Sequence, residues 1–414
     1  MELDFAITIW DEDMLKLNTE KKFIICSLLF MLYFTKFFNY KYWNSTYAGW
    51  GSYVIFLVVV YFFVKCRKNV PKNIPLKKEI ILLLVIPFLQ IISKVFLFGE
   101  SFLDERPLIL FMTFLFFFIL WRYRISEKSI VRAMTIFSLI ALGIQLLQQV
   151  FHSYAVFGVY NEAYMTWTPT DVAEQRNGIY RFRISGYFVV LLCMYYYWSY
   201  FLQKVGFKRF IPFMLMFVSM YLYLTRQILL ASFATIMLSF LFLKGGKGKF
   251  RTIFFLGLFV AFLSLNFEAI FGQLVESSVQ ESTMENVRIM CMSFYWQRIV
   301  ENPLLFLIGH GPLNIIEHWQ TTYRFYLLDI GFFGEWFLYG FFWILLYFRV
   351  IYMILVRYRK EVPMYLKLFV LGTAINSMMI FPYRSPYEYF VWTCVIYLAS
   401  VHIYNKKGYN QCGI

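Results

Sequence analysis

Long apolar runs, separated by short segments that are often basic, recur along the whole chain. A helix that spans a membrane needs roughly 20 mostly apolar residues, within a range of about 17 to 25. The runs therefore predict an all-α polytopic membrane protein with about 12 transmembrane helices. Their cores lie at about 22–38, 47–64, 79–97, 107–121, 129–151, 184–202, 210–225, 228–243, 252–266, 325–348, 364–380 and 387–402.

The balance of residue types agrees with a surface that faces lipid. The chain is 60% hydrophobic and 15% charged, whereas a soluble globular protein carries roughly 25% charged residues. The formal net charge is +15. The basic residues are dispersed between apolar runs rather than gathered on one polar face, which excludes nucleic acid as a partner. No soluble domain or internal repeat is visible, so we expect a single integral membrane domain over 1–414, embedded in the lipid bilayer.

Residue types that hold metals or cofactors are scattered. The six cysteines form no CxxC pair, and the four histidines show no HxxxH or HExxH spacing. No GxxxxGK(S/T) phosphate loop occurs, which argues against an ATP-driven pump. We therefore expect no metal and no cofactor. The first apolar run lacks a small-residue cleavage site, so we also expect no cleaved signal peptide.

Lys and Arg are concentrated in alternate loops. In a twelve-span arrangement these loops share one side, and only Lys41 and Arg106 depart from this in the first half. Cytoplasmic loops carry an excess of Lys and Arg, which places both termini in the cytoplasm. Two large external loops then lie at about 152–183 and 267–324. The segment 286–300 of the second loop is mixed apolar and basic, and it predicts an amphipathic helix at the membrane surface.

From residue 152 onward, the outward segments contain Arg but no Lys, whereas the inward loops mix both. Arg presents a planar fork of donors that grips phosphate or carboxylate bidentately. The arrangement therefore predicts an anionic ligand at the outer face, although pairing with loop acids or snorkelling to headgroups is the alternative for any single Arg. The outward arginines are Arg176, Arg181, Arg183, Arg226, Arg288, Arg298, Arg324 and Arg384.

Arg226 stands out because it lies between two apolar runs with no other charge nearby. In the second loop, His310 lies in GHGP, where the glycines allow close approach of a ligand. His310 is a candidate base, as is Glu317 next to His318, while a solvated or capping loop His is the alternative. For Asp329 and Glu335, near the start of the next run, we expect local ion pairs, with Arg324 as the partner of Asp329.

Four features in order resemble a known family. The first external loop ends in YRFRISG and runs into a span, and LTRQILLAS places an Arg in a short turn between two spans. In the second loop, ten residues separate Arg298 from Gly309 of GHGP, and LLDIGFFGEWFLYG follows. Together with the predicted topology, these features resemble the Wzy-type O-antigen or exopolysaccharide polymerases, within the wider group that includes the O-antigen ligases. The resemblance covers roughly residues 170–345. Ligases typically carry His-Asn before the acidic-Gly segment; here His318 is not followed by Asn, which favours polymerase.

The resemblance implies a membrane glycosyltransferase that joins polyprenyl-diphosphate-linked oligosaccharides at the outer face of the bacterial cytoplasmic (inner) membrane. The lipid diphosphate would be the leaving group, and a chain-length regulator and a flippase would be partner proteins. External arginines would hold the diphosphate, with His310 or Glu317 as the base and Arg226 also serving catalysis. The diphosphate-binding set implied in this way comprises Arg176, Arg181, Arg183, Arg226, Arg288, Arg298 and Arg324.

Other functions remain open from the sequence. An O-antigen ligase shares the topology, and a flippase or transporter would act on the same lipid-linked glycan. A transporter would be expected to show internal repeats and a site reachable from both faces, and most of the functional-looking charge lies on one face. A membrane-bound acyltransferase would need a clearer His signature. The sequence does not distinguish O-antigen from capsule, and it does not identify the sugars.

Overall fold

The structure is a computed structural model that describes most of the predicted helices and two short strands. The predicted span at 47–64 is described only in part, and that at 252–266 lies almost entirely outside the described residues. The described residues are 2–35, 57–65, 73–98, 111–152, 174–176, 179–182, 186–204, 206–223, 226–242, 287–301, 303–310, 325–378 and 385–407, with a few isolated residues between them.

Most of the predicted apolar cores coincide with a helix. The helices are α1 (Glu2–Phe34), α3 (Lys77–Phe98), α5 (Phe116–Tyr123), α6 (Glu127–Val150), α7 (Tyr187–Gln203), α8 (Phe207–Leu222), α9 (Arg226–Leu238), α15 (Phe332–Tyr352), α16 (Met364–Asn376) and α17 (Pro386–Lys406). The predicted external loops contribute β1 (Glu174–Arg176), β2 (Ile179–Arg181), α12 (Val287–Glu301) and α13 (Pro303–Ile308). α12 confirms the helix predicted over 286–300.

Local chemistry explains where several helices begin and end. The Ser126 side chain accepts a hydrogen bond from the backbone N–H of Ser129, which caps the start of α6. α5 ends at Arg124, whose φ of 46° is left-handed and cannot continue a helix. α17 begins with Pro386, which needs no N–H partner in the first turn.

Two helices within the described residues, Glu127–Val150 and Phe332–Arg357, are long and apolar enough to cross a membrane. Apolar side chains also cover outer surfaces of the bundle. On α3, Phe88, Ile92 and Phe96 form an exposed row at helical spacing. A helix that is apolar toward both the core and the outside is typical of a protein in contact with lipid. The described fold is therefore mostly helical and has the character of an all-α membrane-associated protein.

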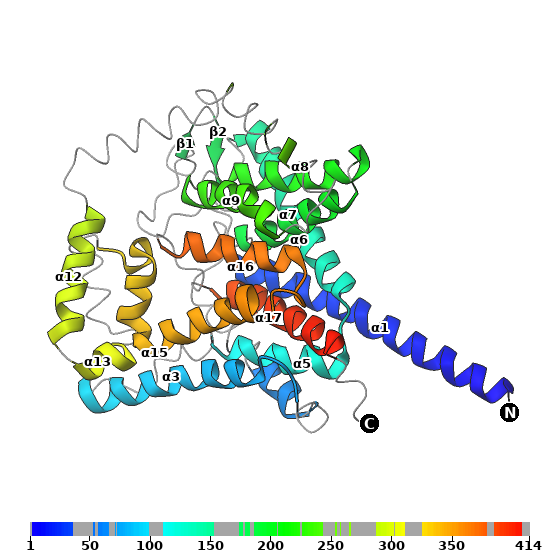
Figure 1. Ribbon diagram of the computed structural model, residues 1–414, viewed down its shortest axis with the longest axis horizontal. Helices are drawn as coiled ribbons and strands as arrows, with labels where there is room; N and C mark the ends of the chain where they lie inside the picture. Colours follow the sequence, from blue (N-terminus) through cyan, green and yellow to red (C-terminus); the bar gives the residue numbers. More distant parts are fainter. Residues whose placement is uncertain are drawn as a thin grey trace.

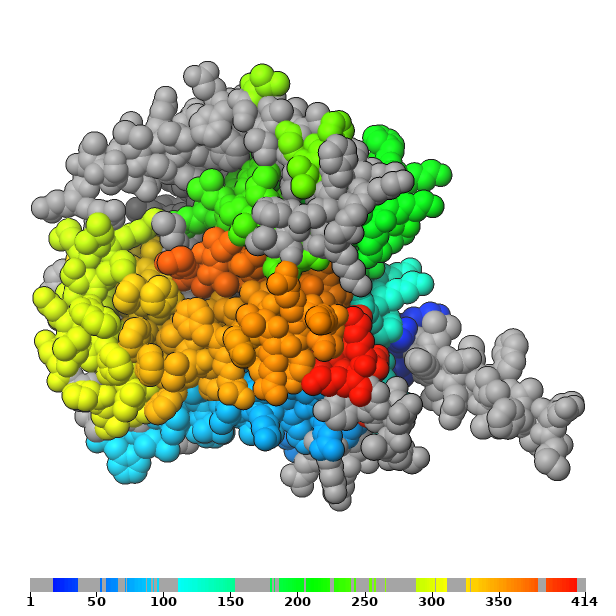
Figure 2. Space-filling view, viewed as in Figure 1, coloured from blue at the N-terminus to red at the C-terminus, as the bar shows by residue number. Residues whose placement is uncertain are grey.

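The helices do not all run in one direction (Figure 1). α3 and α17 run lengthwise, while α12 lies crosswise at one end and α15 bends. The bend is at Gly340, whose backbone has φ 77° and ψ 174° inside the helix. The first part of α15, Phe332–Tyr339, thus packs beside α12, and the remainder joins the lengthwise helices. In Figure 2, α12 forms the surface at that end of the molecule.

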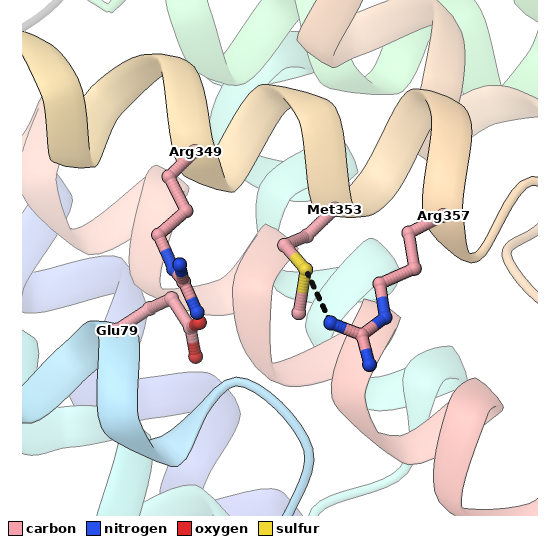
Figure 3. A network of polar contacts seen from close by, with 4 residues as sticks. All are labelled: Glu79, Arg349, Met353 and Arg357. Atoms are coloured by element: carbon pink, nitrogen blue, oxygen red, sulfur yellow. Dashed lines mark hydrogen bonds and ion pairs between the residues drawn. The ribbon is translucent and has the colours of Figure 1, made fainter.

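At one end of the bundle, which we call the basic end, the starts of α3 and α6 meet the ends of α15 and α17. Arg349 Nε lies 2.9 Å from Glu79 Oε1 (Figure 3). His402 Nε2 lies 2.8 Å from Glu127 Oε2. In the same region Arg357 Nη1 donates to Met353 Sδ at 3.8 Å. The segments that meet here are the ones with basic loops that the sequence assigns to a common side.

At the opposite end, which we call the loop end, the starts of α7, α9, α15 and α17 meet the ends of α8 and α16. The Phe332 N–H donates to the Ser377 carbonyl at 2.9 Å, joining α15 to α16. The rings of Tyr187 and Tyr223 contact each other with centroids 6.4 Å apart, joining α7 to α8. The described parts of the two predicted external loops, β1–β2 and α12–α13, are also found here.

Candidate functional site

The described site residues predicted from the sequence all belong to elements of the loop end. Arg176 is in β1, Arg181 in β2 and Arg226 is the first residue of α9; the structure describes the backbone of these three residues. Arg288 and Arg298 are on α12, and His310 follows α13. Arg183, Glu317 and Arg324 lie outside the described residues, as does Arg384.

His310 is fixed against the first part of α15. Its backbone N–H donates to the Phe337 carbonyl at 2.9 Å. Its ring stacks on the Phe337 ring, with centroids 4.0 Å apart and planes 13° apart. Phe337 is itself held by the Tyr295 ring of α12, at 4.7 Å. The His310 side chain is therefore held in place and is not a freely solvated loop residue; only 6% of the residue is exposed.

The protonation of His310 follows from this environment. Burial lowers its pKa from 6.5 to about 4, and the positive charge of Arg298 acts in the same direction. A hydrogen bond to the Phe337 backbone partly opposes them. Neutral imidazole can accept a proton, so at neutral pH His310 has the protonation state that a base requires.

Two glycines allow this arrangement. Gly309 and Gly340 have φ values of +82° and +77°, which side chains rarely adopt. A Cβ on Gly309 would meet the backbone of Leu338 and Gly340. A Cβ on Gly340 would meet the backbone of Ile308 and Gly309. The chain before His310 and the bend of α15 therefore pack backbone to backbone.

Arg298 lies on the part of α12 that faces this contact. Its guanidinium carbon is 3.5 Å from the centroid of the Phe294 ring, and its Nη1 donates to the Phe294 carbonyl at 3.0 Å. Stacking on an aromatic face leaves the outer donors of the guanidinium in a fixed plane. Arg298 and His310 are thus a cation and a neutral base within electrostatic range of each other.

Arg288, at the other end of α12 from Arg298, joins the second external loop to the first turn of α9. With the Gln227 amide oriented so that its oxygen faces Arg288, that oxygen accepts from Nη1 at 2.9 Å and from Nη2 at 3.1 Å. Gln227 follows Arg226 directly in the chain. The structure therefore brings the Arg226 turn and the second external loop, more than 60 residues apart in sequence, to the same place.

Side chains at the end of α6 contact the β1–β2 hairpin of the first external loop and hold it in place. β1 and β2 pair antiparallel, with Glu174 opposite Arg181 and Arg176 opposite Ile179. The Gln149 amide bonds both backbone groups of Tyr180: its oxygen accepts from the Tyr180 N–H at 2.9 Å, and its nitrogen donates to the Tyr180 carbonyl. His152 stacks on the Tyr180 ring at 4.4 Å. The backbone of the Arg181 segment is held in place by these contacts.

The two acids at the start of α15 differ in environment. Asp329 is exposed, whereas only 2% of Glu335 is exposed, and Glu335 lies within electrostatic range of Tyr339 and Tyr347. The predicted partner of Asp329, Arg324, lies outside the described residues, so that ion pair stays a prediction. Glu335 lies in the first turn of α15, near these buried tyrosines, an environment that hydropathy alone does not reveal.

Among the residues that the structure describes, no group of three or more His, Cys, Asp or Glu side chains could hold a metal ion. Cys291 on α12 is buried, and burial together with the charge of Asp329 raises the pKa of its thiol to about 12. It is therefore a packing residue within the α12–α15 contact. Among the described residues, the chemistry available at the loop end is that of guanidinium groups, tyrosine hydroxyls, carboxylates and imidazoles, of which that of His310 is neutral at neutral pH.

The sequence pattern found Arg288, Arg298 and His310, and the structure brings each of them to the loop end. It did not find Gln227 or Phe337, whose partners lie far away in the chain. The contact of Gln227 with Arg288 had one signal, a polar residue beside Arg226 between two apolar runs. No model of a known protein family matches the chain, and no curated protein matches it significantly.

Proposed function

We propose that the protein polymerises polyprenyl-diphosphate-linked glycan repeat units at the outer face of the bacterial cytoplasmic membrane. In this proposal the chain crosses the membrane about twelve times, with the basic end in the cytoplasm and the loop end outside. The proposed polymerase activity is supported by the resemblance to Wzy-type polymerases, which is carried by the segments YRFRISG, LTRQILLAS, GHGP and LLDIGFFGEWFLYG. A chain-length regulator and a flippase are the proposed partner proteins.

One observation carries the proposal. The hydrogen bonds between Gln227 and Arg288 join the LTRQILLAS segment to α12, the helix that also carries Arg298. A donor with a diphosphate needs several guanidinium groups at one place, because a single exposed cation gains little in water. Arg226 directly precedes Gln227 in the chain, and Arg288 and Arg298 both lie on α12, which supports these three arginines as members of the proposed diphosphate site.

The proposed reaction transfers a glycosyl group. The acceptor hydroxyl oxygen attacks the anomeric carbon of the donor, and a new glycosidic C–O bond forms. The C–O bond between that carbon and the diphosphate breaks, and the polyprenyl diphosphate leaves with the bonding electron pair. Arginines stabilise the charge that develops on the leaving group. His310, neutral at physiological pH, takes the hydroxyl proton.

Two variants test the arginine role. Arg226→Ala and Arg298→Ala, expressed in cells that lack the gene, are expected to reach the membrane in normal amounts and to give no polymer ladder. Arg209→Ala is the matched control, because Arg209 is half-buried near the start of α8, where its Nη1 donates to the Tyr200 carbonyl and its guanidinium lies over the Tyr200 ring. A normal ladder from Arg226→Ala would remove the role assigned to that residue.

A further inference from the structure

A buried carboxylate at the loop end has no part in the proposed chemistry. Glu388, in the first turn of α17, is only 2% exposed. Its Oε2 accepts from the Ser385 N–H at 2.9 Å, and its Oε1 accepts from the hydroxyls of Tyr387 at 3.0 Å and Tyr187 at 3.3 Å. Burying a carboxylate is costly unless hydrogen bonds replace its water, and these three donors do so.

Helix capping alone does not account for this arrangement. A capping-box glutamate needs only the backbone N–H of the cap residue, which here is Ser385. The additional bond from Tyr187 crosses from α17 to the start of α7, 201 residues away in the chain. Tyr187 in turn contacts Tyr223 at the end of α8. Glu388 therefore links three helices rather than ending one.

Each of these three helix ends adjoins a segment with an outward arginine. Tyr187 follows Gly186, the last residue of YRFRISG, which contains Arg181 and Arg183. Tyr223 precedes Arg226 by three residues, and Ser385 follows Arg384. Space is tight at this junction: a Cβ on Gly186, which has φ +130°, would lie 2.8 Å from the Phe137 ring and 3.2 Å from the Tyr223 hydroxyl. The start of α7 therefore has little freedom to shift relative to α6 and to the end of α8.

We propose that Glu388 is a positioning residue of the arginine site, which fixes the outer ends of α7, α8 and α17 relative to one another and, with them, the points where the chain enters or leaves segments that bear outward arginines. The inference rests on the proposed function. Glu388 touches neither the substrate nor the reacting atoms in this scheme. It acts through Tyr187 and Tyr387.

Binding of farnesyl diphosphate, a short prenyl diphosphate, to the purified full-length protein in detergent tests the proposal. Glu388→Ala is expected to raise the Kd at least tenfold. Glu388→Gln is expected to stay within about threefold of wild type, because its amide can donate to the tyrosine oxygens and accept from the Ser385 N–H. If Glu388→Ala does not fold, Tyr187→Phe removes one of the hydroxyls, and a three- to tenfold rise is expected.

Glu79→Ala is the matched control. Glu79 is 3% exposed, lies in the first turn of a helix and is hydrogen-bonded, but it belongs to the basic end (Figure 3). It should lower the thermal stability without changing the Kd. An unchanged Kd in both Glu388→Ala and Tyr187→Phe, or an equal rise in Glu79→Ala, would overturn the positioning role.

The outcomes also separate this inference from the proposed function. If the wild-type protein does not bind farnesyl diphosphate, the arginine site and the role of Glu388 both fail. If it binds, and Glu388→Ala weakens binding while deletion of the gene leaves the glycan ladder unchanged, the positioning role stands and the polymerase proposal fails.

Discussion

Gly309 and Gly340 lie backbone against backbone, one before His310 and the other at the bend of α15. Both have a positive φ, and neither leaves room for a Cβ because the other segment fills the space. The contact sets the direction of α15 and the position of the loop that carries His310. Two residues without side chains thus determine where a candidate base lies.

Gly340→Ala and Gly309→Ala are expected to destabilise the protein strongly. The left-handed backbone alone costs a side-chain-bearing residue roughly 1 to 3 kcal/mol, and the clash with the facing backbone adds to this. Thermal unfolding in detergent measures the loss. Gly143→Ala is the control: a Cβ there meets nothing within 4 Å, so in α6 it should be neutral or stabilising by up to about 1 kcal/mol. Equal stability of all three variants would contradict the close contact.

The pKa of His310, lowered from 6.5 to about 4, predicts a pH dependence. Because the unfolded chain binds the proton more readily, His310 favours folding above pH 6.5, and this contribution is lost as the pH falls toward 4. The full loss of folding free energy is roughly 3 kcal/mol. Stability measured between pH 7.5 and 4.5 should fall more steeply for wild type than for His310→Gln.

The same pKa predicts the pH profile of activity. If His310 is the base, the polymerisation rate should stay level from pH 8 down to about 5 and decline only near pH 4. A decline centred near the ordinary histidine value of about 6.5 would show that a different or fully solvated group accepts the proton.

The bond between Gln227 and Arg288 predicts that Lys cannot replace Arg at 288. Lys lacks the planar fork that reaches one oxygen with two nitrogens, so Arg288→Lys should lose as much activity as Arg288→Ala. Gln227→Ala should lose less, and combining it with Arg288→Ala should add little further. Polymer formed per unit of membrane protein is the measurement, and strictly additive effects would show that the two residues act independently.

The exposed apolar rows predict that surface charge is damaging where it would not be in a soluble protein. Phe342, near the middle of α15, is exposed, and a surface substitution in water usually changes stability by less than about 0.5 kcal/mol. In a membrane, Asp at the helix centre costs roughly 2.5 to 3.5 kcal/mol. Phe342→Asp should therefore fail to accumulate in the membrane. Gln297→Asp, at an exposed position of α12, should accumulate normally.

Hydropathy predicts the positions of the helices well because it sums the apolar character of many consecutive residues. The predicted core at 79–97 corresponds to Lys77–Phe98, and that at 129–151 to Glu127–Val150. The same summation conceals the bend at Gly340, because the sequence is apolar on both sides of it. The β1–β2 hairpin was not predicted either. Its three-residue strands depend on Gln149, a distant side chain, rather than on an alternating pattern of their own.

At the candidate site, chain order identified single residues but not their partners. The GHGP segment indicates His310, because it lies between two glycines, and the structure adds the Phe337 ring that holds it. The sequence does not indicate a role for Glu388, because this residue lies at the edge of an apolar run, where an acid resembles an ordinary helix cap. Its partner Tyr187 is distant in the chain and comes close to it only in the folded protein. A contact of this kind depends on tertiary packing, which no local pattern encodes.

The most direct test of the central claim is the ladder of lipid-linked and surface glycan from cells that lack this gene, resolved on a gel. The polymerase proposal predicts loss of the ladder with retention of a single capped repeat unit. Long polymer that never reaches its final acceptor would indicate a ligase, and single repeats confined to the inner leaflet would indicate a flippase. An unchanged ladder would contradict a role in glycan assembly altogether.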